Sequence, residues 1–316
     1  MNTIFPKISL TEVDWAHMLG AQTPWEHRHG IWFKREDYFA PLGYGGPNGS
    51  KMRQLIWYIN RFKQGKTHIV TGASIQSPQL SMSAIVGAHY GLKARQVVYS
   101  KPKTVLKHPN PRIAYGFGAE FEYATGPYNP IIQRKVADLT QPSSLVVEYG
   151  ITLPIDKYSS EDVRKFHEVG ANQTLNIPEQ VERLIVPAGS CNSLTSILLG
   201  LSRNSYNIKE LFTLGIGPEK QDWVAERLRY IGVNSTRNDW PFKWRHFSLH
   251  ESGFSKYSDH FNGEHYQGID FHPTYEAKMW RWLRQHEPIQ EDGKTGFWIV
   301  GSQPDVKVVE PFYTRV

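Results

Sequence analysis

The stretch from Leu42 to Gln54 reads Leu-Gly-Tyr-Gly-Gly-Pro-Asn-Gly-Ser-Lys-Met-Arg-Gln. Its glycines allow a backbone with positive φ and a close approach to a ligand. Lys51 then opens an apolar pattern of helical period, and Ser50 is the expected N-cap. A cation is disfavoured at the positive end of a helix dipole, so we interpret Lys51 as a reactive amine. The alternative is a surface loop followed by a solvated lysine.

Strand patterns alternate with helical patterns on both sides of this stretch. The predicted strands are residues 30–37, 67–72, 94–99, 120–123, 144–149, 183–187, 210–217 and 296–300. Besides the helix from Ser50, helices are predicted at 78–90, 110–117 with Asn110 as N-cap, 129–139, 161–172, 220–231 and 274–285, and before Leu201. Residues 234–268 read as irregular. The alternation predicts an α/β fold of open, mostly parallel sheets flanked by helices.

The bulk composition suits a soluble globular chain of one large or two medium domains, with 316 residues, 40% hydrophobic and 21% charged. A single cysteine excludes an internal disulfide and suits a reducing compartment. No stretch reaches the roughly 20 apolar residues of a membrane helix, and the N-terminus lacks a signal-peptide pattern. We therefore expect no membrane partner and a cytoplasmic location, which is the host cytoplasm if the source is viral. The net charge of +6 permits an anionic partner without requiring one.

Three polar turns are expected at the carboxyl ends of strands, where open α/β sheets bind their ligands: residues 43–51, 73–79 and 188–195. The third turn contains Gly189, Ser190, Cys191, Asn192, Ser193 and Thr195 and opens directly onto a helix. Free N–H groups, hydroxyls and the helix dipole predict a phosphate cradle there, although the turn lacks Walker and Rossmann spacing. An ordinary capped helix is the alternative. A reactive lysine combined with a phosphate site favours pyridoxal phosphate (PLP), which needs both.

Three ordered motifs carry a family resemblance. They are Lys34-Arg35-Glu36-Asp37 with the Gly-rich loop and Asn48-Gly49-Ser50-Lys51-Met52-Arg53-Gln54, then Ala73-Ser74-Ile75-Gln76-Ser77-Pro78-Gln79, then His272-Pro273-Thr274-Tyr275-Glu276-Ala277-Lys278. The chain resembles the tryptophan-synthase-β-like superfamily, the PLP enzymes of fold type II. Within it, 1-aminocyclopropane-1-carboxylate deaminase and D-cysteine desulfhydrase are the most similar. The resemblance implies two domains with the cofactor between them. We expect a large PLP-binding domain of residues 1–50 and 156–316 and a small α/β domain of residues 51–155.

The resemblance also implies roles for the matching residues. Lys51 would form the Schiff base and then move protons at the substrate's α-carbon. Ser77 and Gln79, with Gln76 beside them, would bind the substrate carboxylate, and Ser77 would also act on the ring or side chain. Tyr275 would be a second catalytic acid or nucleophile. Glu276 would face the pyridine nitrogen and keep it protonated, and the turn 189–195 would bind the phosphate.

Several positions depart from the family pattern. Pro78 replaces an asparagine that donates a hydrogen bond to the cofactor's phenolic oxygen, and proline cannot donate. Other departures are Ser50 for asparagine, Gln54 for a lysine close to the phosphate, Ser74 for glycine, and Val300-Gly301-Ser302 without the usual histidine or threonine. Since the lysine, the carboxylate site and the pyridine partner are kept, we interpret the chain as a PLP enzyme with an altered substrate or reaction. A degenerate scaffold without PLP is the alternative.

The stretch from Arg237 to Gln267 interleaves aromatic and basic residues, a pattern that suits stacking on bases and contacts to phosphates. The alternative is a cover over the active site whose rings pack inward. No His, Cys or Asp spacing resembles a metal set, so we predict no metal site. Cys191 has no paired base, and we expect it to pack or donate an N–H group within the phosphate turn.

These observations favour a PLP-dependent enzyme that acts at the α-carbon of an amino-acid group by deamination, elimination or decarboxylation. A second hypothesis is that the amino-acid group is attached to a nucleobase in DNA, as in viral thymine hypermodification. A third is a non-catalytic binding protein that kept the fold. The sequence leaves open which bond at the α-carbon breaks. By analogy with the family we expect a homodimer.

Overall fold

The computed structural model describes residues 14–233 and 240–313. Its larger sheet has the strand order β1-β2-β12-β7-β8-β9, and its smaller sheet has the order β5-β4-β3-β6. The larger sheet consists of β1 (Trp25–Arg28), β2 (Ile31–Arg35), β12 (Thr295–Ile299), β7 (Arg183–Ala188), β8 (Glu210–Gly215) and β9 (Lys243–Ser248). The smaller sheet consists of β5 (Glu120–Tyr123), β4 (Lys93–Val98), β3 (His68–Gly72) and β6 (Ser144–Val147). All pairings within these two sheets are parallel except that of β1 with β2.

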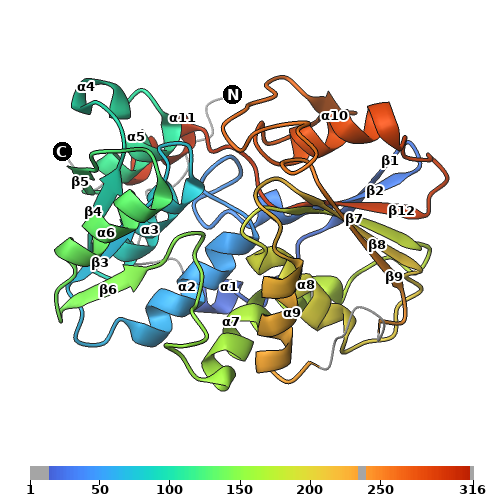
Figure 1. Ribbon diagram of the computed structural model, residues 1–316, viewed down its shortest axis with the longest axis horizontal. Helices are drawn as coiled ribbons and strands as arrows, with labels where there is room; N and C mark the ends of the chain where they lie inside the picture. Colours follow the sequence, from blue (N-terminus) through green and yellow to red (C-terminus); the bar gives the residue numbers. More distant parts are fainter. Residues whose placement is uncertain (1–13, 234–239, 314–316) are drawn as a thin grey trace.

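The helices connect and cover these strands (Figure 1). They are α1 (Trp15–Met18), α2 (Ser50–Phe62), α3 (Pro78–His89), α4 (Pro102–Val105), α5 (Pro109–Gly116), α6 (Asn129–Leu139), α7 (Ser160–Ala171), α8 (Asn192–Leu201), α9 (Gln221–Tyr230), α10 (Glu276–His286) and α11 (Val306–Val309). A short hairpin joins β10 (His265–Tyr266) to β11 (Ile269–Asp270). The predicted α/β class with parallel sheets flanked by helices is confirmed.

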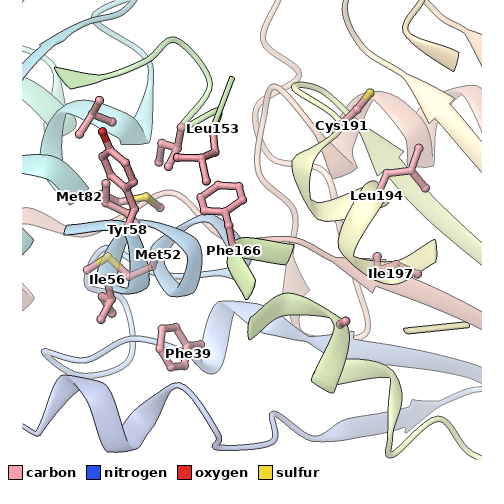
Figure 2. Packing of buried hydrophobic residues seen from close by; sticks show 14 of the residues in the cluster. Phe39, Met52, Ile56, Tyr58, Met82, Leu153, Phe166, Cys191, Leu194 and Ile197 are labelled. Atoms are coloured by element: carbon pink, nitrogen blue, oxygen red, sulfur yellow. The ribbon is translucent and has the colours of Figure 1, made fainter. Parts of the chain in front are cut away.

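The larger sheet is buried on both faces because its strands alternate between two hydrophobic clusters. Leu184 and Val186 of β7 belong to the cluster that includes α2, α7 and α8. Ile185, between them in sequence, belongs to the cluster under α10. In Figure 1, α10 lies above this sheet and α8 and α9 lie below it. Figure 2 shows Tyr58 of α2 and Phe166 of α7 among the side chains of the first cluster.

Three local predictions were wrong. Gly49 is the N-cap of α2 and Ser50 is its first residue. His108 is the N-cap of α5, two residues before the expected Asn110, because Pro109 supplies the first helical φ. Residues 243–248 form the edge strand β9 inside the region expected to be irregular. The domain boundaries at residues 50 and 155 stay a prediction. The strands of the smaller sheet run from His68 to Val147, and those of the larger sheet lie outside that range.

Candidate functional site

Lys51 is held in place by the contact between the Gly-rich loop and the end of β12. Gly49 has φ +96°, and a Cβ there would lie 2.2 Å from the carbonyl oxygen of Val300. The next residue, Ser50, donates its backbone N–H to the same oxygen at 3.1 Å. Only glycine permits this approach, so the loop fixes where α2 begins and presents Lys51 in the first turn.

A buried ion pair supports the same turn from behind. Glu36 accepts a hydrogen bond from Arg53 Nε at 3.2 Å, and both side chains are fully buried. Glu36 also accepts from the hydroxyl of Ser50 at 3.2 Å, which explains why Ser50 does not cap the helix. Thr23 completes the contacts of this carboxylate. Lys51 therefore lies between two residues that the Glu36 carboxylate holds.

The side chain of Lys51 opens into a pocket of about 550 Å³, a volume that includes its mouth. Burial, together with the positive charge of Lys220, lowers the pKa of Lys51 to about 8. Its Nζ lies 5.8 Å from the ring centre of Tyr275. At neutral pH, a lysine with this pKa is a deprotonated nucleophile far more often than a solvated lysine.

The phosphate turn places four of its six predicted residues at the pocket: Gly189, Ser190, Cys191 and Ser193. Cys191 caps α8 in the left-handed conformation, with φ +66°. Burial raises the pKa of its thiol to about 12, so the thiol stays protonated. Thr195 instead donates its hydroxyl to the carbonyl of Cys191 at 2.9 Å. Asn192 is fully buried, and its amide donates to the carbonyls of Gly150 and Ile151. These two residues shape the turn from inside.

Tyr275 and Glu276 lie where α10 begins. The hydroxyl of Tyr275 lies 3.1 Å from that of Tyr257, and burial raises the pKa of Tyr275 well above its ordinary value. Glu276 is fully buried behind the end of β12, and its Oε1 accepts from the backbone N–H of Val300 at 2.8 Å. Its Oε2 has no hydrogen-bond partner among the described residues. Burial raises the pKa of Glu276 to about 8.

The loop 73–79 contains the three predicted substrate residues, Gln76, Ser77 and Gln79. They differ in whether their side chains are free to bind a substrate. Ser77 caps α3, and its hydroxyl accepts from the N–H of Gln79 at 3.3 Å. The side chain of Gln79 is buried and hydrogen-bonded at both ends, to Thr71 at 2.7 Å and to the N–H of Gly150 at 2.8 Å. Gln79 therefore joins α3 to the strand ends, and carboxylate binding by its side chain stays a prediction.

Gln76 lines a second, polar cavity beside the first one. The two cavities share His272. The second is lined by Gln76, Asn110, His260, Asn262, His272, Pro273, Thr274 and Gln303, and we call it the amide chamber. Burial lowers the pKa of His272 to about 3, so its ring is neutral. The chamber brings both sheets' loops together, which no local sequence pattern could reveal.

Asn48 and Ser302 are further pocket residues, to which the sequence analysis assigned no role. The amide of Asn48 donates to Ser302 Oγ at 3.0 Å and accepts from the Ser302 N–H at 2.8 Å. Both residues line the pocket around Lys51. They are 254 residues apart in sequence, so only the fold reveals the pairing. The signal that was available is the asparagine in the Gly-rich loop.

The site has the chemical groups that PLP requires. Lys51 offers an amine of lowered pKa, and the turn 189–193 offers hydroxyls and the N-terminus of a ten-residue helix. The unpartnered Oε2 of the buried Glu276 lacks the hydrogen-bond partner that buried polar atoms normally have. These residues fit the cofactor.

The aromatic and basic stretch packs mainly against the body of the protein. Its residues 237–239 lie outside the described part of the chain. Phe242 and Trp244 belong to the first hydrophobic cluster, and several other rings pack against the second. Arg245 pairs with Glu210 and Glu287. These contacts agree with a cover whose rings pack inward, and nucleic-acid binding by this stretch stays a prediction.

Residues 14–233 and 240–313 contain neither a cluster of metal ligands nor a candidate membrane helix. Within these ranges, no three His, Cys, Asp or Glu side chains gather closely enough to hold a metal ion. No helix in the same ranges is both long and apolar enough to cross a membrane.

Comparisons with known proteins identify relatives by sequence and by fold. A protein of Salmonella phage ViI, described as an O-seryl-dTMP PLP-dependent decarboxylase, is 34% identical over 96% of this chain and 88% of its own length. No family model matches the chain. An ACC deaminase homologue has TM-score 0.68 at 17% identity, covering 94% of this chain and 92% of its own. Diaminopropionate ammonia lyase of Escherichia coli has TM-score 0.59 at 11% identity, covering 98% and 93%. The last two likenesses show the fold.

Proposed function

Because the chain belongs to the family of the phage ViI PLP-dependent decarboxylase, we propose that it removes the carboxyl group from an amino acid attached to a nucleotide base. The chain is a PLP-dependent enzyme of fold type II. The observation that carries the proposal is the 34% identity along nearly the whole chain to an enzyme described as acting on O-seryl-dTMP.

Bound PLP supplies an electron sink for the pair left at the α-carbon when a bond to it breaks. We assign the covalent attachment of the cofactor to Lys51, whose lowered pKa favours the free amine. The substrate's amine would take the place of Nζ on the cofactor, and the freed Nζ would then deliver a proton to the α-carbon after carbon dioxide leaves. Ser190, Ser193 and the N-terminus of α8 bind the phosphate. Glu276 holds the proton shared with the pyridine nitrogen, which its raised pKa supports.

The wall around Pro78 favours loss of the carboxylate over its retention. Pro78, Met82 and Pro187 line the pocket, and none of them has a side-chain donor. Pro78 also lacks a backbone N–H. A carboxylate that reaches an apolar wall loses hydration and becomes less stable than the neutral carbon dioxide it can release. Ser77 keeps its assigned role in positioning the substrate, and Tyr275, whose ring centre lies 5.8 Å from Lys51 Nζ, keeps its role as the candidate acid.

The amide chamber supports a substrate larger than a free amino acid. The amides of Asn262 and Gln303 in its lining can both donate and accept, as the edge of a base requires. Since His272 borders both cavities, a base in the chamber would carry its amino-acid arm toward Lys51. We propose that the chamber holds the base.

The test offers the enzyme O-seryl-dTMP, free serine and unmodified dTMP, and measures carbon dioxide release. Release from O-seryl-dTMP alone supports the proposal. Release from free serine would show an enzyme of free amino acids. A wild-type protein that stays colourless with added PLP would instead support the non-catalytic scaffold. The visible spectrum beside that of Lys51→Ala identifies the lysine, since only the wild type should turn yellow.

Three expectations accompany this proposal. A homodimer is typical of the family and is tested by light scattering in solution. A cytoplasmic setting, in a host cell if the gene is viral, agrees with the phage origin of the relative. A nucleic-acid partner is the third expectation, because a modified base can be part of a DNA chain.

A further inference from the structure

The positive charge of the chain is concentrated in one segment. The 82 residues from Tyr38 to Ala119 contain eleven Lys and Arg and no Asp or Glu. The rest of the chain contains 25 Lys and Arg against 30 Asp and Glu. The net charge of +6 therefore arises entirely within this acid-free segment, which forms α2 to α5 with β3 and β4.

The arginines of the segment are already paired with acids from elsewhere. The four pairs are Arg53–Glu36, Arg61–Asp162, Arg95–Glu122 and Arg112–Glu310. Lys101, Lys103 and Lys107 differ, because all three are exposed and form no ion pair with any described residue. Uncompensated charge of this kind attracts a polyanion.

Lys101 is the N-cap of α4, Lys103 lies within this helix and Lys107 follows it, in the segment directly after β4. Parallel strands end at a common edge, so this segment and the loop 73–79 after β3 leave the sheet on the same side. The two loops also touch. Gln76 Nε2 lies 3.1 Å from His108 Nδ1, and Asn110 donates to the Gln76 carbonyl at 3.1 Å. Gln76 and Asn110 both line the amide chamber. Lys107 is therefore the neighbour in sequence of a residue that contacts the chamber lining, and Lys101 and Lys103 belong to the same segment.

An exposed ring completes the surface. Tyr99 follows β4 and is 48% exposed. Aromatic rings beside lysines bind single-stranded DNA by stacking on bases while the cations contact phosphates. In Figure 1, α4 stands at the outer corner of the smaller sheet.

We propose that Tyr99, Lys101, Lys103 and Lys107 bind the backbone of a DNA strand whose modified base enters the amide chamber. The proposal rests on the proposed function for the identity of the base. It adds that the substrate is polymeric DNA, which needs phosphates flanking the target nucleotide.

The test uses holoenzyme and a labelled oligothymidylate of about 12 nucleotides, within the length that such surfaces cover. Binding is followed by fluorescence anisotropy over a range of salt concentrations. The triple variant Lys101→Gln, Lys103→Gln, Lys107→Gln should bind at least about tenfold more weakly. Its slope of log affinity against log salt should be smaller by about 2, as expected for three lost phosphate contacts on a single strand.

A matched triple variant, Lys165→Gln, Lys209→Gln, Lys294→Gln, removes the same charge from exposed lysines outside the acid-free segment. It should bind the oligonucleotide nearly as the wild type does. Equal loss in both triples would overturn the proposal, because net charge alone would then explain binding. An unchanged salt slope in the first triple would overturn it as well. If the triple variant is unstable, the single variant Lys103→Glu is measured in the same anisotropy assay. It should also bind the oligonucleotide more weakly than the wild type.

Decarboxylation separates this proposal from the proposed function. The first triple should retain wild-type turnover of O-seryl-dTMP and lose turnover of the same base within DNA. If the wild type converts neither substrate, the proposed function fails, while the anisotropy result still decides the DNA surface. If the triple converts both substrates like the wild type, the DNA surface is wrong and the proposed function stands.

Discussion

Burial and a neighbouring cation both disfavour the charged form of the Lys51 amine. Burial and the neighbouring Lys220 lower its pKa to about 8. Capture of PLP by cofactor-free protein requires the neutral amine, so the capture rate should rise with pH and reach half of its maximum near pH 8. Stopped-flow absorption at the yellow band measures this rate. A flat profile across neutral pH would contradict the assignment, and Lys51→Ala should capture none.

Lys220 is a cation that the motifs did not predict. Its charge lowers the pKa of both Lys51 and Cys191, so it lies near the phosphate turn. The loop after β8, which leads to Lys220, lies beside that turn because Ile216 donates to the Ala188 carbonyl. The family has a lysine close to the phosphate at the position of Gln54. We expect Lys220 to supply that positive charge here.

The variant Lys220→Met should therefore bind PLP about tenfold more weakly, the effect of losing one charged hydrogen bond. It should also move the pH midpoint of PLP capture upward, because a positive neighbour of Lys51 is gone. Equilibrium dialysis and the capture profile measure the two effects. Lys209→Met is the control, and equal weakening in both variants would refute the role.

Pro78 bears on which bond breaks. The variant Pro78→Asn restores a backbone donor and an amide at the pocket wall, and should stabilise the substrate carboxylate. We expect decarboxylation of O-seryl-dTMP to slow by about tenfold or more, since one hydrogen bond to a charged group contributes about 1.5–3 kcal/mol. Carbon dioxide release under saturating substrate measures this. An unchanged rate, with normal PLP binding, would show that the wall does not govern the reaction.

At the scale of elements, the start of α2 depends on the buried Glu36–Arg53 pair. The variant Glu36→Ala leaves Arg53 charged and buried, which costs about 3–5 kcal/mol of unfolding free energy. Urea denaturation measures the loss. The exposed pair of Glu161 and Lys165 is the comparison, and Glu161→Ala should leave the unfolding free energy nearly unchanged. A much smaller loss for Glu36→Ala would contradict this prediction, because it would mean that water hydrates the charge of Arg53 in the variant.

Sequence periodicity predicted most elements because their signals are local. The apolar face of α2 and the proline at the start of α3 suffice to place both helices. The edge strand β9 was missed because Lys243–Ser248 mixes charged and aromatic residues without alternation, and its pairing with β8 is what makes it a strand. Caps were misplaced where a tertiary contact, such as Ser50 to Glu36, takes the side chain.

In the candidate site, too, some residues have local sequence signals and others are brought together only by the fold. Lys51 and the turn 189–193 follow from local glycines, hydroxyls and a helix start. The amide chamber could not be predicted, because Gln76 and Gln303 come from opposite ends of the chain. The structural role of the Gln79 side chain could not be predicted either, since its partners Thr71 and Gly150 are brought to it by the fold.

At the scale of the whole molecule, the excess of positive charge and most of the cofactor residues belong to different parts of the chain. The cofactor residues come mainly from the larger sheet, whereas the surface proposed for DNA lies on the smaller one. DNA binding is thus assigned to the side of the smaller sheet and the reaction to the side of the larger sheet, with Lys51 between them.

The position of β12 in the larger sheet has a consequence for synthesis on the ribosome. This strand lies between β2 and β7, although it is the last strand made. The smaller sheet needs residues only up to Val147 and can form while translation continues. The pocket needs Val300, which receives the N–H of Ser50 and donates its own to Glu276. A nascent chain therefore carries its lysine for most of its elongation without a cavity, and cofactor loading must wait until residue 300 has left the exit tunnel.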